Sequence, residues 1–68
     1  MSNWQKVFSD KHEYRAEIVI AVLKESGLQP VLVNKKDAAY QFGHFEVLVA
    51  PDDVIRALKI IENDIEFT

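Results

Sequence analysis

The 68-residue sequence contains no cysteine, which removes one common way of stabilising a small protein. A chain of this length buries only about 60% of the surface that its unfolded form exposes, so disulfides or metal ions often add stability. Disulfides are excluded here, and only two histidines offer imidazole ligands. Association with a partner is the remaining common remedy. We therefore expect one domain over residues 1–68 that is able to form homo-oligomers.

Catalytic signatures are missing as well. The only glycines, Gly27 and Gly43, are too few and too far apart for a phosphate-binding loop. Ser9 lies near His12, but that spacing more simply fits the start of a helix. A His44-x-Glu46 pair supplies two possible ligands, whereas a structural zinc site needs four. We predict a non-enzymatic protein with no catalytic residue, no cofactor and no metal site.

Long apolar runs and excess positive charge are also absent. The longest apolar run spans residues 18–23, far short of the roughly 20 residues that cross a membrane. The first residues lack the basic start and apolar stretch of a signal peptide, and a cysteine-free chain fits a reducing compartment. The net charge of −3 disfavours a nucleic-acid binder. We therefore expect a cytoplasmic protein that binds neither membranes nor nucleic acid.

What is present predicts a strand followed by a helix. Aromatic and β-branched residues predict a strand over 4–8. Asp10, three residues before Glu13, resembles a capping box for a helix over 11–26, and Gly27 suits its end. Arg15 lies within the apolar face, so we expect its head to reach solvent or a carboxylate, and Ile20 lies toward the polar side. The expected apolar face consists of Tyr14, Ile18, Val19, Val22 and Leu23.

The second half predicts two more strands and a second helix. Pro30 precedes a strand over 31–33, and residues 44–49 alternate between apolar and polar. Pro51, Asp52 and Asp53 fit the start of a helix. The expected stripe of that helix consists of Val54, Ala57, Leu58, Ile61 and Ile65. The last residues, 66–68, are too few for more than a vestigial strand.

This order predicts an α+β, ferredoxin-like split β-α-β-β-α(-β) domain, with a three- to four-stranded antiparallel sheet and two helices on one face. The right-handed crossover rule places strand 44–49 between the other two strands. The sheet face away from the helices, here named the open face, would then carry Leu32, Asn34, His44, Glu46 and Leu48. Two alternatives remain for Trp4 and Phe8: both point to the open face, or a bulge or terminal twist turns one of them into the core.

The segment over residues 34–43 is long for a hairpin loop and combines cations with aromatics. Two interpretations stand: a solvated basic turn, or a site for a small anionic ligand. The candidate ligand-binding residues are Asn34, Lys35, Lys36, Tyr40, Phe42 and His44. The candidate oligomer interface consists of Trp4, Lys6, Phe8 and Leu48, on the first strand and the open face.

Four stretches resemble a bacterial family of proteins described as putative signal transducers of unknown function. They are residues 4–8, 12–18, 33–37 and 45–51, and the resemblance covers nearly the whole chain. It implies a regulatory domain similar in fold to PII-like, ferredoxin-like nitrogen regulators, and it carries no ligand or catalytic residue. The leading hypothesis is therefore a regulatory binding module that uses the segment 35–43 and the open face. The alternative is an interaction or homodimerisation domain without a small ligand.

Overall fold

The computed structural model describes residues 3–37 and 42–65, and its elements follow the predicted β-α-β-β-α order. Strand β1 covers Gln5–Asp10, helix α1 covers Glu13–Glu25 and strand β2 covers Val31–Asp37. Strand β3 covers Phe42–Val49, and a 3-10 turn at Pro51–Asp53 leads into helix α2 at Val54–Asp64. Neither helix is an apolar segment of membrane-spanning length.

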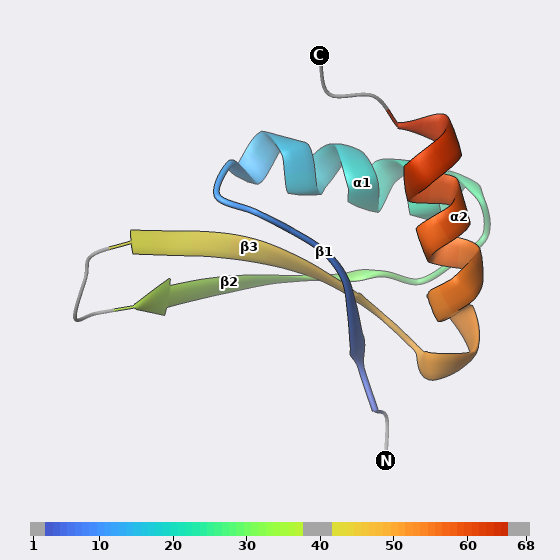
Figure 1. The fold of residues 1–68 in the computed structure, drawn as a ribbon, viewed down its shortest axis with the longest axis horizontal. Coiled ribbons are helices and arrows are strands. Elements are labelled where there is room, and N and C mark those ends of the chain that lie inside the picture. Colours follow the sequence, from blue (N-terminus) through green and yellow to red (C-terminus); the bar gives the residue numbers. More distant parts are fainter. Residues whose placement is uncertain (1–2, 38–41, 66–68) are drawn as a thin grey trace.

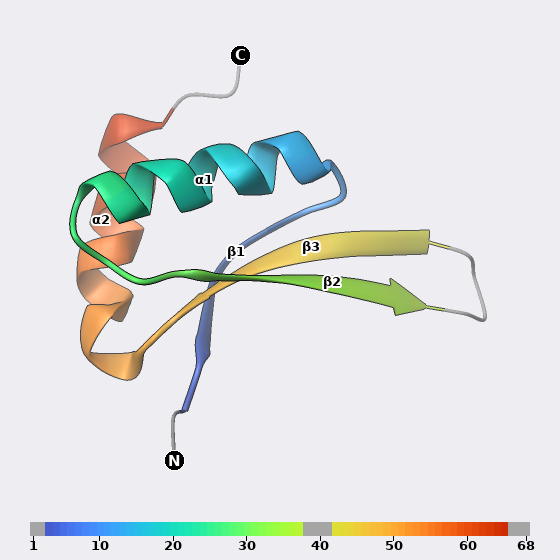
Figure 2. The same ribbon diagram turned by 180° about the vertical axis from the view of Figure 1, so that it is seen from behind.

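The three strands form an antiparallel sheet in the order β1-β3-β2, as the crossover rule predicted (Figure 1). Helix α1 connects the two outer strands, and β3 returns between them. Both helices lie on the same side of the sheet in the two opposite views of Figures 1 and 2. The α+β class and the two-layer arrangement are therefore confirmed. A fourth strand would fall on residues 66–68, which lie outside the described chain.

The core lies between the helices and the centre of the sheet. Its fully buried side chains come from both layers: Ala16, Val19, Leu23, Val47, Val49 and Ala57. The predicted alternation of β3 is confirmed, because Val47 and Val49 are buried while Phe45 packs at the edge of the same cluster. Burial of these aliphatic groups supplies the main driving force for folding.

A bulge in β1 decides between the two alternatives for Phe8. Lys6 pairs with Leu48, but Phe8 pairs with the buried Val47, so Val7 is the extra residue. Residues directly opposite each other in an antiparallel pair share a sheet face. Phe8 therefore points to the helix side, where it packs against the core. Trp4 lies just before β1, and 43% of it is exposed.

Helix α1 is shorter than predicted, and its buried face is rotated. It begins at Glu13, and its N-cap is His12, which makes no side-chain capping hydrogen bond; the predicted capping box at Asp10 is wrong. Ile20 packs against the core, whereas Tyr14 and Ile18 are exposed, so the prediction was wrong for all three. Residues 18–23 are apolar on nearly every side of the helix, so the sequence pattern does not show which side is buried. Contact with the sheet determines the buried side.

The end of α1 matches its prediction. Gly27 has a φ of 90°, in the left-handed region that favours glycine. The Leu28 N–H donates to the Leu23 carbonyl at 3.0 Å, which closes the last turn. Arg56 of α2 donates to the carbonyl of Ser26, so a cation of one helix satisfies the exposed carbonyl end of the other.

Helix α2 buries only part of the predicted stripe. Ala57 is fully buried, and Val54, Ile61 and Ile65 pack against the core. Leu58, however, is 46% exposed, and Ile60 packs against the core as well. The prediction for Leu58 was therefore wrong. The helix also begins later than expected, because Pro51 opens the 3-10 turn instead.

Candidate functional site

Most residues of the predicted loop belong to strands in the structure. Strand β2 continues through Lys35 and Lys36 to Asp37, and β3 begins at Phe42, so only residues 38–41 separate the strands. The prediction of a loop over residues 35–43 was therefore wrong for residues 35–37 and 42–43, which belong to strands. Tyr40 lies outside the described residues, and only the backbone of Phe42 is described. In the ribbon views the paired ends of β2 and β3 run on beyond the first turn of α1 (Figures 1 and 2).

The strand register divides the remaining candidates between the two faces. Lys35 pairs with His44, and both belong to the open face. Lys36 pairs with Gly43 and Asn34 pairs with Phe45, so these two lie on the helix side. The adjacent residues Lys35 and Lys36 therefore lie on opposite faces of the sheet.

The open face has a different composition from the predicted one. Leu32 packs against the core opposite Val47, so its assignment to the open face was wrong, as was that of Asn34. The open-face residues whose side chains are described are Lys6 and Ser9 from β1, Val31, Val33 and Lys35 from β2, and His44, Glu46 and Leu48 from β3.

Charged side chains from all three strands meet around Glu46. His44 Nε2 lies 2.9 Å from Glu46 Oε2, and Lys6 Nζ lies 4.0 Å from the same oxygen. Lys35 stands on the other side, opposite His44. We name Lys6, Lys35, His44 and Glu46 the open-face cluster. Helix layers cover the opposite side of the sheet, so this cluster faces outward in the described chain.

The electrostatics of the cluster keep Glu46 ionised. The hydrogen bond from His44 holds the pKa of Glu46 below its ordinary 4.5, and the positive charges of Lys6 and Lys35 act in the same direction. The Glu46 side chain is only 15% exposed, against 56% for Lys6 and 47% for His44. The cluster therefore presents its basic side chains outward and keeps its one carboxylate beneath them.

The predicted interface residues are also separated. Lys6 and Leu48 are opposite each other on the open face. Trp4, two residues before Lys6, is partly exposed. The bulge turns Phe8 to the helix side of the sheet, where it packs against the core, so Phe8 does not lie on the open face with the other candidates. Val31 and Val33, which sequence reasoning missed, extend the apolar part of this face beside Leu48.

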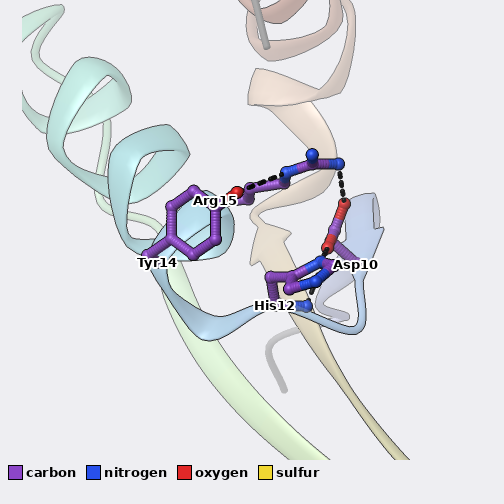
Figure 3. Close-up of polar contacts among 4 residues, drawn as sticks. All are labelled: Asp10, His12, Tyr14 and Arg15. Carbon is purple, nitrogen blue, oxygen red and sulfur yellow. Dashed lines mark hydrogen bonds and ion pairs between the residues drawn. The ribbon is translucent and has the colours of Figure 1, made fainter. Parts of the chain in front are cut away.

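A second polar cluster joins the end of β1 to the start of α1 (Figure 3). Asp10 Oδ1 accepts a hydrogen bond from the His12 N–H at 2.7 Å and lies 3.0 Å from His12 Nδ1. Arg15 reaches the other carboxylate oxygen at 3.4 Å and the Tyr14 hydroxyl at 3.2 Å. The expectation that Arg15 meets a carboxylate is confirmed. These contacts fix the turn between strand and helix.

Acid should weaken this second cluster. The His12 N–H hydrogen bond, with help from the His12 and Arg15 side chains, lowers the pKa of Asp10 below the ordinary 3.8. A carboxyl whose pKa is lower in the folded chain stabilises it above the unfolded pKa, and this effect is lost as pH falls through the folded value. Asp10→Asn should therefore reduce the unfolding free energy at pH 7 and have little effect near pH 2. Urea titrations at both pH values measure the difference, and equal losses would contradict the assignment.

Nothing in either cluster assembles a metal centre. Among residues 3–37 and 42–65, no three His, Cys, Asp or Glu side chains lie close enough together to hold an ion. The open-face cluster supplies one imidazole and one carboxylate beside two ammonium groups. Such a set fits the recognition of an anion better than the coordination of a cation.

Comparison with known proteins agrees with the resemblance seen in the sequence. Residues 4–64 match the family described as "Putative prokaryotic signal transducing protein". The match covers nearly the whole described fold, including both clusters. The chain therefore belongs to this family. No curated protein and no solved structure matches it.

Proposed function

We propose that the chain is a non-enzymatic regulatory module that recognises a small anionic ligand through the open-face cluster. The observation that carries the proposal is the presence of Lys6, Lys35 and His44 around Glu46 on a sheet face that no described helix covers. The described side chains of this face include two lysines and one shielded glutamate, although the whole chain carries a net charge of −3. A cationic spot on an acidic protein attracts anions selectively.

Glu46 orients the donors in this account. Its carboxylate accepts from His44 Nε2, which leaves Nδ1 of a neutral ring as an acceptor, so the donors that face an anion are the ammonium groups of Lys6 and Lys35. Lys6 and Lys35 come from the two outer strands, so a carboxylate or phosphate between them could accept from both sides. Val31 and Leu48 form an adjacent apolar strip for the uncharged part of a ligand.

Catalysis finds little support in the same geometry. In a nucleophilic triad the imidazole stands between the hydroxyl and the carboxylate. Here Ser9 pairs with Glu46 across the strands and His44 Nε2 contacts Glu46, so the carboxylate, and not the imidazole, is the group opposite Ser9 in the register. The order of groups suits binding and favours a module that senses a ligand without transforming it.

The adjacent lysines provide a matched test. A thermal-shift screen with inorganic phosphate, di- and tricarboxylates and nucleoside phosphates selects the anions that bind. Lys35→Ala should weaken their binding about tenfold, the loss of one charge-assisted hydrogen bond. Lys36→Ala should leave affinity nearly unchanged, because Lys36 lies on the other face. Calorimetry measures both, and equal effects or the absence of any binding anion would contradict the proposal.

A homo-oligomer is the second candidate, and two outer strands favour it. In the described chain β1 and β2 each have one neighbour, and Trp4 is partly exposed beside β1. Sedimentation equilibrium together with Trp4 fluorescence distinguishes the candidates. A dimer whose dissociation red-shifts Trp4 emission would favour self-association through this edge.

A further inference from the structure

The outer side of β2 is a regular, uncovered strand edge. Its register against β3 runs without a shift from Val31 to Asp37. The edge of β1, by contrast, is interrupted by the bulge at Val7. In Figures 1 and 2 no other described element lies along the outer side of β2. Alternate residues of such a strand direct N–H and C=O groups away from the sheet.

The chemistry of an edge specifies what can occupy it. Free backbone donors and acceptors in a straight row are satisfied by another extended backbone. Lys35 and Lys36 lie at one end of the strand and project from opposite faces. An added strand would therefore meet one ammonium group above its plane and one below it. At the other end, Val31 and Val33 are on the open face beside Leu48.

We infer that β2 binds an extended acidic peptide segment of a partner protein by strand addition. The segment carries two adjacent acidic residues at the end that lies beside Lys35 and Lys36, because neighbouring residues of a strand point to opposite faces. Beside Val31 and Val33 it carries β-branched residues at alternate positions. The inference rests on the proposed regulatory role and names a protein partner for the module, on a strand edge that shares Lys35 with the open-face cluster.

A competing explanation is that the two lysines only protect the edge. Lysine on an outer strand discourages pairing with a second copy, and many proteins use it in this way. The two explanations differ in a measurable respect. If the lysines only protect the edge, their removal produces self-association and no peptide preference. If they recognise acidic residues, their removal weakens a peptide that the native chain selects.

The test begins with a phage-displayed library of random dodecapeptides, panned against the full chain and counter-selected on the Lys35→Glu, Lys36→Glu double variant. Enriched peptides should share an adjacent acidic pair and alternating β-branched residues. Each of Lys35→Ala and Lys36→Ala should weaken a selected synthetic peptide about 2- to 5-fold, the range for an exposed ion pair. Lys24→Ala, an exposed lysine on α1, is the control and should not change affinity. Circular dichroism confirms that each variant is folded.

Backbone pairing is tested separately. A selected peptide that is N-methylated at alternate residues in the register facing β2 should lose more than tenfold in affinity, because the methyl groups remove the donors that pair with the edge. Unchanged affinity would overturn the inference. A library without enrichment would also overturn it, and so would a Lys35→Ala, Lys36→Ala variant that binds the selected peptide as tightly as the native chain. Weakening of a small anion by Lys35→Ala alone would leave the proposed function standing while strand addition failed.

Discussion

Leu23→Ala should remove about 2–5 kcal/mol of unfolding free energy, a large share of the stability of a domain this small. Leu23 is fully buried and belongs to the cluster that joins α1 to the sheet. Truncation loses the burial of three carbon atoms and leaves a cavity that the surrounding side chains fill only in part. Urea titration followed by circular dichroism measures the loss.

Leu58→Ala is the matched control for this prediction. Leu58 is 46% exposed on α2, so its truncation should cost less than about 1 kcal/mol. Sequence periodicity alone predicted the opposite, with Leu58 central in the buried stripe. Similar losses at Leu23 and Leu58 would mean that α2 faces the sheet with a different side.

Ala57→Leu should destabilise the chain by about 1–3 kcal/mol, because it places a larger side chain at a position that is already packed against the core. Ala57 is fully buried and is the one buried residue of α2 among those described. A leucine there would push α2 away from the core and disturb the contact of Arg56 with the carbonyl of Ser26. The midpoint of a urea titration should fall.

Ala21→Leu controls for the intrinsic effect of leucine in a helix. Ala21 is exposed on α1, and the two residues have similar helix propensities, so stability should change by no more than about 0.5 kcal/mol. If Ala57→Leu were equally neutral, the packing of α2 on the core would be looser than described.

Element order and strand topology could be predicted because local signals and chain connectivity agreed. The alternation of residues 44–49 identified the buried side of β3, and a single crossover rule placed it in the centre. Gly27 marked the end of α1 because few residues adopt its φ. These features depend on backbone geometry that the sequence constrains strongly.

The faces of the helices could not be predicted with equal success. Ile18 and Ile20 have the same side chain, yet Ile18 is exposed and Ile20 packs against the core. Ala16 is fully buried, but the predicted apolar face did not include it because its side chain is small. Close approach of α1 to the sheet selects such small residues, and that approach is set by tertiary packing.

The candidate site was predicted in part. Lys35 and His44 were selected as candidates, and the sheet brings them together. The polar residues 34–37 suggested a loop because they lack the apolar alternation of a half-buried strand. They form a strand nonetheless, since β3 supplies their backbone partners and the ribbon is exposed. Glu46 gained its central position only through the register of three strands, which local sequence does not reveal.

Amide chemical shifts test the central claim that the open-face cluster is the binding surface. The ¹⁵N-labelled chain is titrated with the tightest-binding anion from the screen, at low and at high salt. We expect the largest shifts at Lys6, Lys35, His44 and Glu46, with smaller shifts at Lys36, and weaker binding at high salt. Largest shifts around Asp10–Arg15 or Arg56, or no shifts at millimolar anion, would contradict the account.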